Sequence, residues 1–193
     1  MSWGWYSHDD ARVDAAIRPV GCNHLTYLDV IVLSSITPCV FVAKRDIAAW
    51  PLFGWLARAA GTIFVDREHR LSSPAVVDLV RDAITGGLVV VLFPEGTSSD
   101  GSTVLPFKSA LLESAVQLHC PVSAAAIGYE LDQGSVATEV CYWGDMTFGP
   151  HLVNLLFKRK ILANCSFSVP KIRFGDRKEI ARELHDEVVS IRL

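Results

Sequence analysis

Two polar side chains near the start of the chain, His24 and Asp29, have the types and the spacing of a general base and its orienting carboxylate. In one regular helix, a separation of five residues turns two side chains about 140° away from each other. They could meet only if His24 lies in the turn that enters a helix and folds back over its first turn. Asp29 would then accept the imidazole N–H, and the other ring nitrogen would be free to take a proton. For this pair alone, a helix-capping histidine and a separate, exposed aspartate is the default interpretation.

A more specific signal is the segment FPEGT at residues 93–97, which completes the continuous apolar run LVVVLF. Such a run is typical of a strand buried on both faces. Its proline stops ladder pairing, so Glu95 is expected at the strand end and Gly96 in a tight turn or against a ligand. Thr97 and the two serines after it add hydroxyl groups. Five specified residues would arise by chance roughly 6 times in 100,000 chains of this length, although an ordinary strand exit with a solvated glutamate is the alternative.

A third candidate, Arg67, follows the short apolar segment TIFV. A guanidinium group at a strand end can clamp a phosphate or a carboxylate with two parallel N–H groups. The alternative is a surface arginine paired with Asp66 or Glu68.

The elements that must position these residues alternate between strands and helices. This pattern predicts a single α/β domain, residues 1–193, with a mixed, mostly parallel sheet covered by helices. The expected strands are residues 20–22, 39–43, 62–65, 88–93, 122–127, 136–143 and 167–169. The expected helices are residues 27–35, 46–59, 74–85 and 108–118, and a last amphipathic helix that begins at a capping box formed by Asp176 and Glu179. Ligands bind at strand ends in such sheets, so the polar segments are expected to meet there.

Composition excludes several other classes of protein. Half of the 193 residues are hydrophobic and only 20% are charged, which excludes a disordered chain. The formal net charge of −3 argues against general nucleic-acid binding. The five cysteines are too widely spaced for a zinc half-site and are expected to be reduced thiols, and the scattered histidines suggest no metal site. We find no secretory signal and no run of about 18 apolar residues that would cross a membrane.

Together the motifs occur in the order and rough spacing of the four sequence blocks of the glycerophospholipid acyltransferases. The four blocks are His24-xxxx-Asp29, Gly61-xx-Phe64-xx-Arg67, the FPEGT segment and Pro121-Val122. The chain therefore resembles the lysophosphatidic acid acyltransferase family over residues 20–143.

This resemblance implies a glycerolipid acyltransferase-like fold and a reaction. A fatty acyl group would pass from acyl-CoA or acyl carrier protein to the free hydroxyl of a lysolipid, 1-acylglycerol-3-phosphate first, in phospholipid biosynthesis. His24 would deprotonate that hydroxyl and Asp29 would orient His24, with no covalent enzyme intermediate. No cofactor or metal is implied beyond the acyl donor. The substrate-binding residues that the resemblance implies are Arg67, Glu95, Gly96, Thr97 and Lys108.

Several departures from the family pattern leave alternatives open. Ser98 stands where many members have arginine after FPEGT, and Ala124 stands where many have a second proline. The segments FPEGTSSDG and YWGDM look like the branch with bacterial ornithine-lipid O-acyltransferases, which makes lyso-ornithine lipid the alternative acceptor. Because few residues precede His24 and Arg18-Pro19 interrupts the expected strand, a longer N-terminus is expected in the whole protein.

Two alternatives from other functional classes are a non-catalytic lipid-binding module and a hydrolase. The intact His24 and Asp29 argue against the module. The hydrolase lacks support, since the sequence has no G-x-S-x-G segment around a serine.

Contact with a membrane surface is a further expectation. Trp50 and Trp55 lie in an apolar segment, and the basic residues 158–160 follow a stretch rich in leucine and phenylalanine. Tryptophan favours the membrane interface, and lysine and arginine favour anionic head groups. The expected location is peripheral, on the cytoplasmic face of the membrane, and the alternative is a packed helix with a solvated basic turn.

Overall fold

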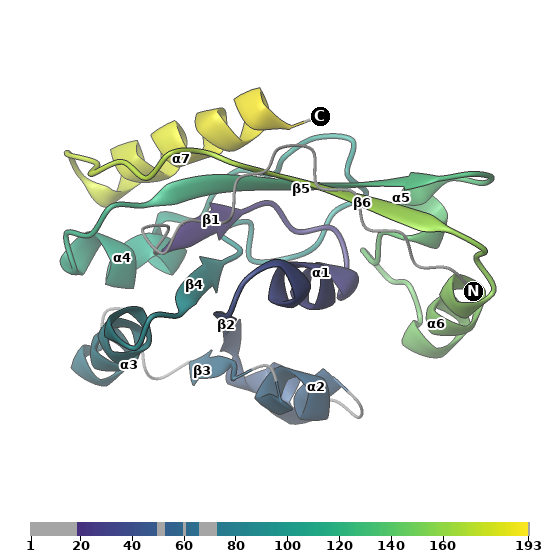
Figure 1. The fold of residues 1–193 in the computed structure, drawn as a ribbon, viewed down its shortest axis with the longest axis horizontal. Helices are drawn as coiled ribbons and strands as arrows, with labels where there is room; N and C mark the ends of the chain where they lie inside the picture. The colour runs from purple at the N-terminus through teal and green to yellow at the C-terminus, as the bar shows by residue number, and fades with distance from the viewer. Residues whose placement is uncertain (1–18, 50–52, 60, 66–72, 193) are drawn as a thin grey trace.

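One six-stranded sheet organises the structure, a computed structural model that describes residues 19–49, 53–59, 61–65 and 73–192. The strand order is β3-β2-β4-β1-β5-β6 (Figure 1). The strands are β1 (Val20–Cys22), β2 (Cys39–Lys44), β3 (Ile63–Val65), β4 (Val89–Leu92), β5 (Ser123–Leu131) and β6 (Ile161–Phe167). All neighbouring strands pair in parallel except β5 and β6, which are antiparallel. The predicted mixed, mostly parallel sheet is confirmed.

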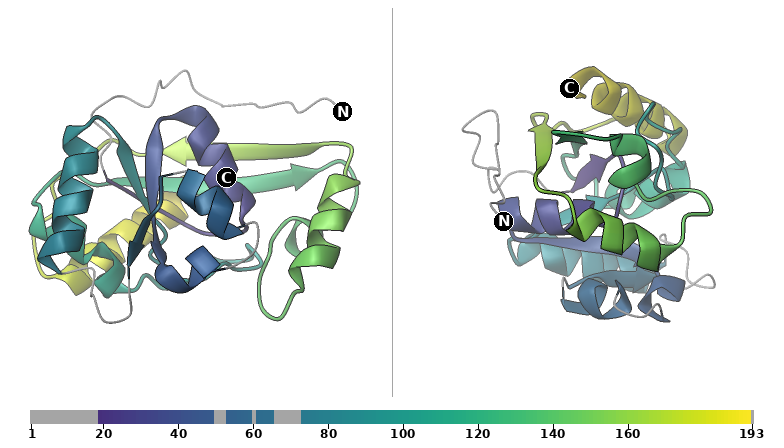
Figure 2. Two further views of the ribbon diagram at one scale, coloured as in Figure 1. Left: turned by 90° about the horizontal axis from the view of Figure 1, so that it is seen from below. Right: turned by 90° about the vertical axis from the view of Figure 1, so that its right-hand side faces the viewer.

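Helices cover both faces of this sheet (Figure 2). They are α1 (Leu28–Ile36), α2 (Phe53–Ala59), α3 (Pro74–Thr85), α4 (Glu113–Gln117), α5 (Val136–Glu139), α6 (Phe148–Leu156) and α7 (Arg177–Ile191), with 3₁₀ turns η1 (Arg45–Ala49) and η2 (Ser109–Leu112). In β4, Val89 and Val91 pack into the cluster under α1, whereas Val90 and Leu92 pack into the cluster under α3, α4 and α7. The run LVVVLF is therefore buried on both faces, as its composition predicted.

A glycine in β1 allows the last helix to approach the sheet closely. A Cβ atom on Gly21 would stand 2.4 Å from Cδ2 of Leu184 on α7. A larger side chain at this position would force the buried side chain of Leu184 to move, so Gly21 allows the present packing of α7 on β1. The predicted capping box is also present, because Asp176 accepts the N–H of Glu179 and the Glu179 side chain accepts the N–H of Asp176.

The structure corrects two predicted strands. Residues 136–143 do not form a strand: they begin with the short helix α5, and the backbone then continues irregularly. The side chain of Glu139 accepts the N–H of Ser135, which closes the first turn of this helix. The strand expected at 167–169 is wrong in its bounds: β6 spans Ile161–Phe167, so of the expected residues only Phe167 lies in it. The polar Asn164, which hydrogen-bonds to Glu130 across the pair, interrupts the apolar pattern that would have predicted this strand.

Two predicted helices are divided. The helix expected over 46–59 appears as η1 and α2, with Pro51 in the sequence between them, and proline cannot continue a helical hydrogen-bond ladder. The helix expected over 108–118 appears as η2 followed by α4. No helix within the described part of the chain is long and apolar enough to cross a bilayer.

Candidate functional site

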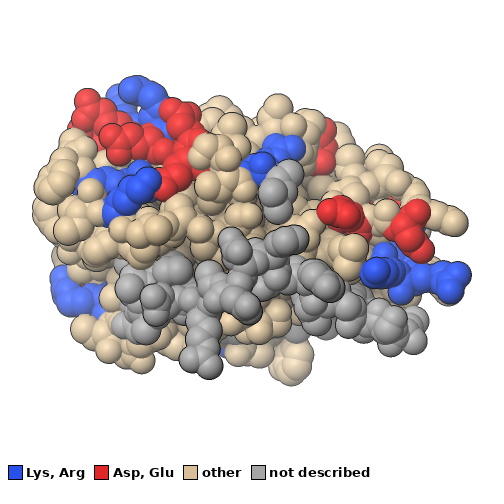
Figure 3. Space-filling view, turned by 45° about the horizontal axis from the view of Figure 1, so that its top comes forward, with Lys and Arg blue, Asp and Glu red and all other residues tan. Residues whose placement is uncertain are grey.

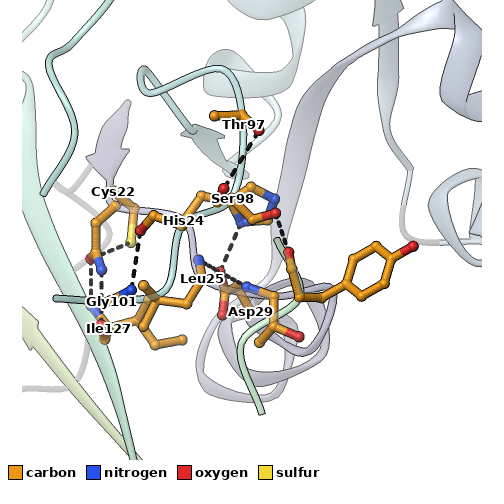
Figure 4. Close-up of polar contacts among 12 residues, drawn as sticks. Cys22, His24, Leu25, Asp29, Thr97, Ser98, Gly101 and Ile127 are labelled. Carbon is orange, nitrogen blue, oxygen red and sulfur yellow. Dashed lines mark hydrogen bonds and ion pairs between the residues drawn. The ribbon is translucent and has the colours of Figure 1, made fainter. Parts of the chain in front are cut away.

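The turn after β1 is held to β5 by an asparagine side chain. Backbone pairing between the two strands reaches Cys22 opposite Ala125. Beyond it, Asn23 donates its amide to the carbonyl oxygen of Ile127 at 2.9 Å and accepts the N–H of Ile127 at 2.8 Å (Figure 4). The side chain thus replaces one backbone ladder pair, which lets the chain leave the sheet directly before His24. Asn23 was not among the predicted site residues.

His24 lies in the turn that precedes α1 and folds back over its first turn. Its Nδ1 atom lies 2.8 Å from Oδ2 of Asp29, which is the arrangement that the five-residue spacing required. The His24 side chain is 23% exposed, whereas Asp29 is fully buried. Within the described residues no hydrogen bond reaches Nε2 of His24, so that nitrogen is placed to take a proton from a bound molecule.

Four donors converge on the Asp29 carboxylate. Oδ2 accepts the backbone N–H groups of Leu25 at 2.7 Å and Thr26 at 3.1 Å in addition to the imidazole. Oδ1 accepts the hydroxyl of Tyr129 on β5 at 2.7 Å. This set of donors suits a carboxylate, which is an acceptor at both oxygens. Tyr129 was missed because its distance from the motif in the sequence carries no signal.

The FPEGT segment buries its glutamate. Glu95 is 1% exposed, and neither carboxyl oxygen has a hydrogen-bond partner among the described residues. Burial raises the pKa of Glu95 to about 8, and the Asp29 charge adds to this rise. The N–H groups of Leu105 and His24 face the carboxyl group and offset part of the rise, without the geometry of an ordinary hydrogen bond. The alternative of a solvated glutamate is wrong, and the carboxyl group lies beneath the loop.

The turn after Glu95 brings Lys108 back to the motif. Gly96 has φ of 69°, and a Cβ atom there would stand 2.9 Å from Nζ of Lys108. The N–H of Lys108 also donates to the carbonyl oxygen of Pro94 at 2.8 Å. Thr97 is exposed at the tip of the same turn. Gly96, Thr97 and Lys108 are therefore neighbours, as a shared binding role requires.

The segment after α5 ties the two motifs together. Ser98 donates its hydroxyl to the carbonyl oxygen of Tyr142, and the N–H of Tyr142 donates to the carbonyl oxygen of Leu25 at 2.9 Å (Figure 4). Ser99 also donates its N–H to the carbonyl oxygen of His24 at 3.0 Å. Many members of the acyltransferase family that the chain resembles have arginine at the position of Ser98. Here the Ser98 side chain is instead used in a hydrogen bond within the protein, to Tyr142. The predicted site residue Arg67 lies outside the described residues, as does Trp50.

Comparisons with known proteins agree with these motifs. A sequence model of the family described as "Acyltransferase" matches residues 20–128. The lyso-ornithine lipid O-acyltransferase of Rhizobium meliloti is 34% identical over 183 residues, covering 86% of this chain and 62% of that protein. The 1-acyl-sn-glycerol-3-phosphate acyltransferase of Neisseria meningitidis is 34% identical over 123 residues, covering 64% of this chain and 48% of that protein. The chain therefore spans less than two thirds of the length of these two curated relatives.

A solved structure has the same fold. The crystal structure of the 1-acyl-sn-glycerophosphate acyltransferase PlsC from Thermotoga maritima superposes with a TM-score of 0.59 and 20% identity. The match covers 96% of this chain and 68% of that chain. The predicted α/β fold of the glycerolipid acyltransferase type is thereby confirmed.

Proposed function

Because the chain belongs to the acyltransferase family, we propose that it moves a fatty acyl group from acyl-CoA or acyl carrier protein to the free hydroxyl of a lysolipid. The observation that carries this proposal is the 2.8 Å contact between His24 Nδ1 and Asp29 Oδ2. It holds the imidazole in one tautomer and directs Nε2, the basic nitrogen, away from the carboxylate.

The chemistry follows from that tautomer. Nε2 of His24 takes the proton of the lysolipid hydroxyl as its oxygen attacks the thioester carbonyl carbon. The new C–O bond forms, the C–S bond breaks, and the leaving thiolate takes the proton back from the imidazolium. Base assistance of this kind contributes about 10² to 10⁴ in rate, and the rest comes from positioning the two substrates.

For the acceptor we favour a lyso-ornithine lipid over 1-acylglycerol-3-phosphate, which reverses the order that the resemblance alone implied. The similarity to a lyso-ornithine lipid O-acyltransferase extends over 86% of the chain, against 64% for a glycerol-phosphate enzyme.

The charges near the loop that follows Glu95 also favour lyso-ornithine lipid as the acceptor. Lys108 is exposed against Gly96 and is available to a carboxylate head group. Among the described residues a second cation beside this loop, Arg192, donates to the carbonyl oxygens of Gly101 and Ser102. Ser98, committed to Tyr142, offers no charge where relatives place arginine. A phosphate monoester carries nearly two negative charges and the ornithine carboxylate carries one, so the loss of a cation at position 98 weakens the hold on the phosphate more, whatever Arg67 adds for either acceptor.

We also propose that the protein meets the lipid through α6, as a peripheral protein on the cytoplasmic face of the membrane. Helix α6 buries His151 and Leu155 on its inner side. On its outer side Val153, Leu156 and Phe157 are 53%, 56% and 81% exposed, and we call these three residues the α6 surface. An exposed apolar cluster at helical spacing is suited to the acyl boundary of a bilayer.

The basic residues 158–160, which follow the α6 surface in the sequence, are expected to contribute little to membrane binding. Lys158 is paired with Glu139 at 2.6 Å, which leaves Arg159 and Lys160 exposed for anionic head groups. On the face shown in Figure 3, basic and acidic side chains are interspersed. Apolar insertion is therefore expected to dominate the contact, with a small electrostatic contribution.

A lysolipid panel tests the proposal. Purified protein is incubated with lyso-ornithine lipid or lysophosphatidic acid and with labelled acyl-CoA or acyl carrier protein. We expect transfer to lyso-ornithine lipid at the higher rate, and a rate about 10² to 10⁴ lower with His24→Ala. Transfer only to lysophosphatidic acid would overturn the acceptor, release of free fatty acid would indicate the hydrolase, and binding without transfer would indicate the non-catalytic module.

A further inference from the structure

We propose that Tyr129 is a positioning residue for the general base, acting through Asp29 from the far side of the carboxylate. The inference rests on the proposed function and deepens it. The hydroxyl of Tyr129 donates to the buried Asp29, so its effect on the base passes through the two hydrogen bonds that link it to His24.

The geometry divides the two carboxylate oxygens between two tasks. Oδ2 receives the imidazole of His24 at 2.8 Å, together with the backbone of the turn. Oδ1 receives the hydroxyl of Tyr129 at 2.7 Å, and Tyr129 is its partner among the described residues. Because Asp29 is fully buried, loss of this donor would leave Oδ1 unsatisfied, and the carboxylate would be held through Oδ2 alone.

Strand β5 supplies a rigid reference for this contact. Tyr129 is 8% exposed and belongs to the core cluster under α1. Two positions earlier on the same strand, Ile127 exchanges two hydrogen bonds with the side chain of Asn23. The turn that carries the base is therefore attached to β5 at both of its ends, by Asn23 before His24 and by Asp29 after it.

Tyr129 is suited to be a permanent donor. Burial and the neighbouring Asp29 charge hold the pKa of its phenol well above the usual value, so the hydroxyl keeps its proton. A hydrogen bond from a neutral donor disperses the carboxylate charge and weakens the pull of Asp29 on the imidazolium. The other groups that face Asp29 are Glu95 and the thiols of Cys22, Cys141 and Cys165. None of them changes when the phenol hydroxyl is removed.

The test compares Tyr129→Phe with Tyr27→Phe. Tyr27 is the matched control, since its hydroxyl bonds to Nδ1 of His151 at 3.1 Å instead of to Asp29. In Tyr129→Phe we expect kcat to fall about 3- to 10-fold with KM little changed, as for the loss of one ordinary hydrogen bond. The acid limb of the pH–rate profile should move to higher pH, because the imidazolium is better stabilised. Tyr27→Phe should leave that limb in place.

A measurement on the imidazole itself separates this inference from the proposed function. The ring ¹⁵N resonances of His24, assigned by their loss in His24→Ala, are titrated in the wild type and in both variants. Tyr129→Phe should raise the titration midpoint by about half a pH unit or more. An unchanged midpoint together with an unchanged acid limb would overturn the role of Tyr129, even if stability fell. If no lysolipid is acylated, the proposed function fails while the ring titration still decides this inference.

Fluorotyrosine keeps the test open if Tyr129→Phe does not fold. Incorporated at position 129 alone, with Tyr6, Tyr27 and Tyr142 left as tyrosine, it preserves the ring and makes the hydroxyl a stronger donor. The His24 midpoint should then move to lower pH, opposite to the shift in Tyr129→Phe. No shift would contradict the proposal.

Discussion

The imidazole ring of His24 stacks on the ring of Phe93, with the centroids 4.1 Å apart and the planes at 24°. Phe93 in turn stacks on Phe41 of β2, with centroids 6.0 Å apart. The first residue of the FPEGT segment thus supports the base from the face of its ring, while Asp29 holds the edge. Stacking of this kind restricts the ring to one orientation, which is what a positioned base needs.

Replacement of the base should greatly slow transfer without unfolding the protein. His24→Ala is expected to lower turnover by about 10² to 10⁴, the usual contribution of a positioned base. Asp29→Asn should also be severe, and less stable, because its NH₂ group would face donors. Turnover and thermal unfolding are measured together, with His119→Ala as the control for loss of an imidazole outside the site. Unchanged turnover in folded His24→Ala would remove the mechanism.

Glu95 should make stability depend on pH. Its pKa is raised from 4.5 to about 8 in the folded protein. Between these pH values the folded state holds a proton that the unfolded chain has released, so the free energy of unfolding falls as the pH rises. The slope from this group is at most about 1.4 kcal/mol per pH unit. Glu95→Gln is neutral at every pH and should therefore lose that slope. Near pH 8 its free energy of unfolding should exceed that of the wild type.

Urea unfolding of both proteins across this pH window checks the prediction, since contributions of other groups largely cancel in the difference. Glu130→Gln, which changes an exposed glutamate on β5, is the control and should keep the wild-type slope. Parallel curves for Glu95→Gln and wild type would show that Glu95 is ionised in the folded protein.

Two substitutions at Ser98 separate its structural contribution from acceptor selection. Ser98→Ala removes the hydrogen bond to Tyr142 and should lower turnover of both acceptors alike. Ser98→Arg loses the same bond but adds a cation, and a charge-assisted contact favours a phosphate by about 10-fold. We expect the ratio of kcat/KM for lysophosphatidic acid over lyso-ornithine lipid to rise only in Ser98→Arg. Equal ratios in both variants would show that this position does not select the head group.

The α6 surface should determine retention on lipid vesicles. Phe157→Ser is expected to reduce co-sedimentation with vesicles that contain anionic lipid. Phe174→Ser is the matched control, because Phe174 is 82% exposed but lies near the start of α7, at the other end of the molecule from α6 (Figure 1). Salt should weaken binding only modestly, since Lys158 is already paired with Glu139. Equal losses in both variants, or no retention of the wild type, would contradict the proposed surface.

The sequence by itself was sufficient for the elements whose signals are local. The LVVVLF run predicted a strand buried on both faces, Asp176 and Glu179 predicted the start of α7, and the FPEGT segment predicted a turn at the strand end. Each of these depends on residues within one strand or one helical turn. The five-residue spacing of His24 and Asp29 likewise restricted the pair to a turn entering a helix.

Only the tertiary structure decided which distant residues complete the site. Tyr129 and Ile127 reach the turn through the pairing of β5 beside β1, and Tyr142 reaches both motifs by crossing the end of the sheet. Residues 136–143 were predicted as a strand because their local pattern suits one, but the structure has the short helix α5 there, whose first turn is closed by the contact between Ser135 and Glu139. The burial of Glu95 could not be predicted from the sequence either. The motif specifies a glutamate at this position, but the loop packed over it determines whether water reaches the carboxyl group.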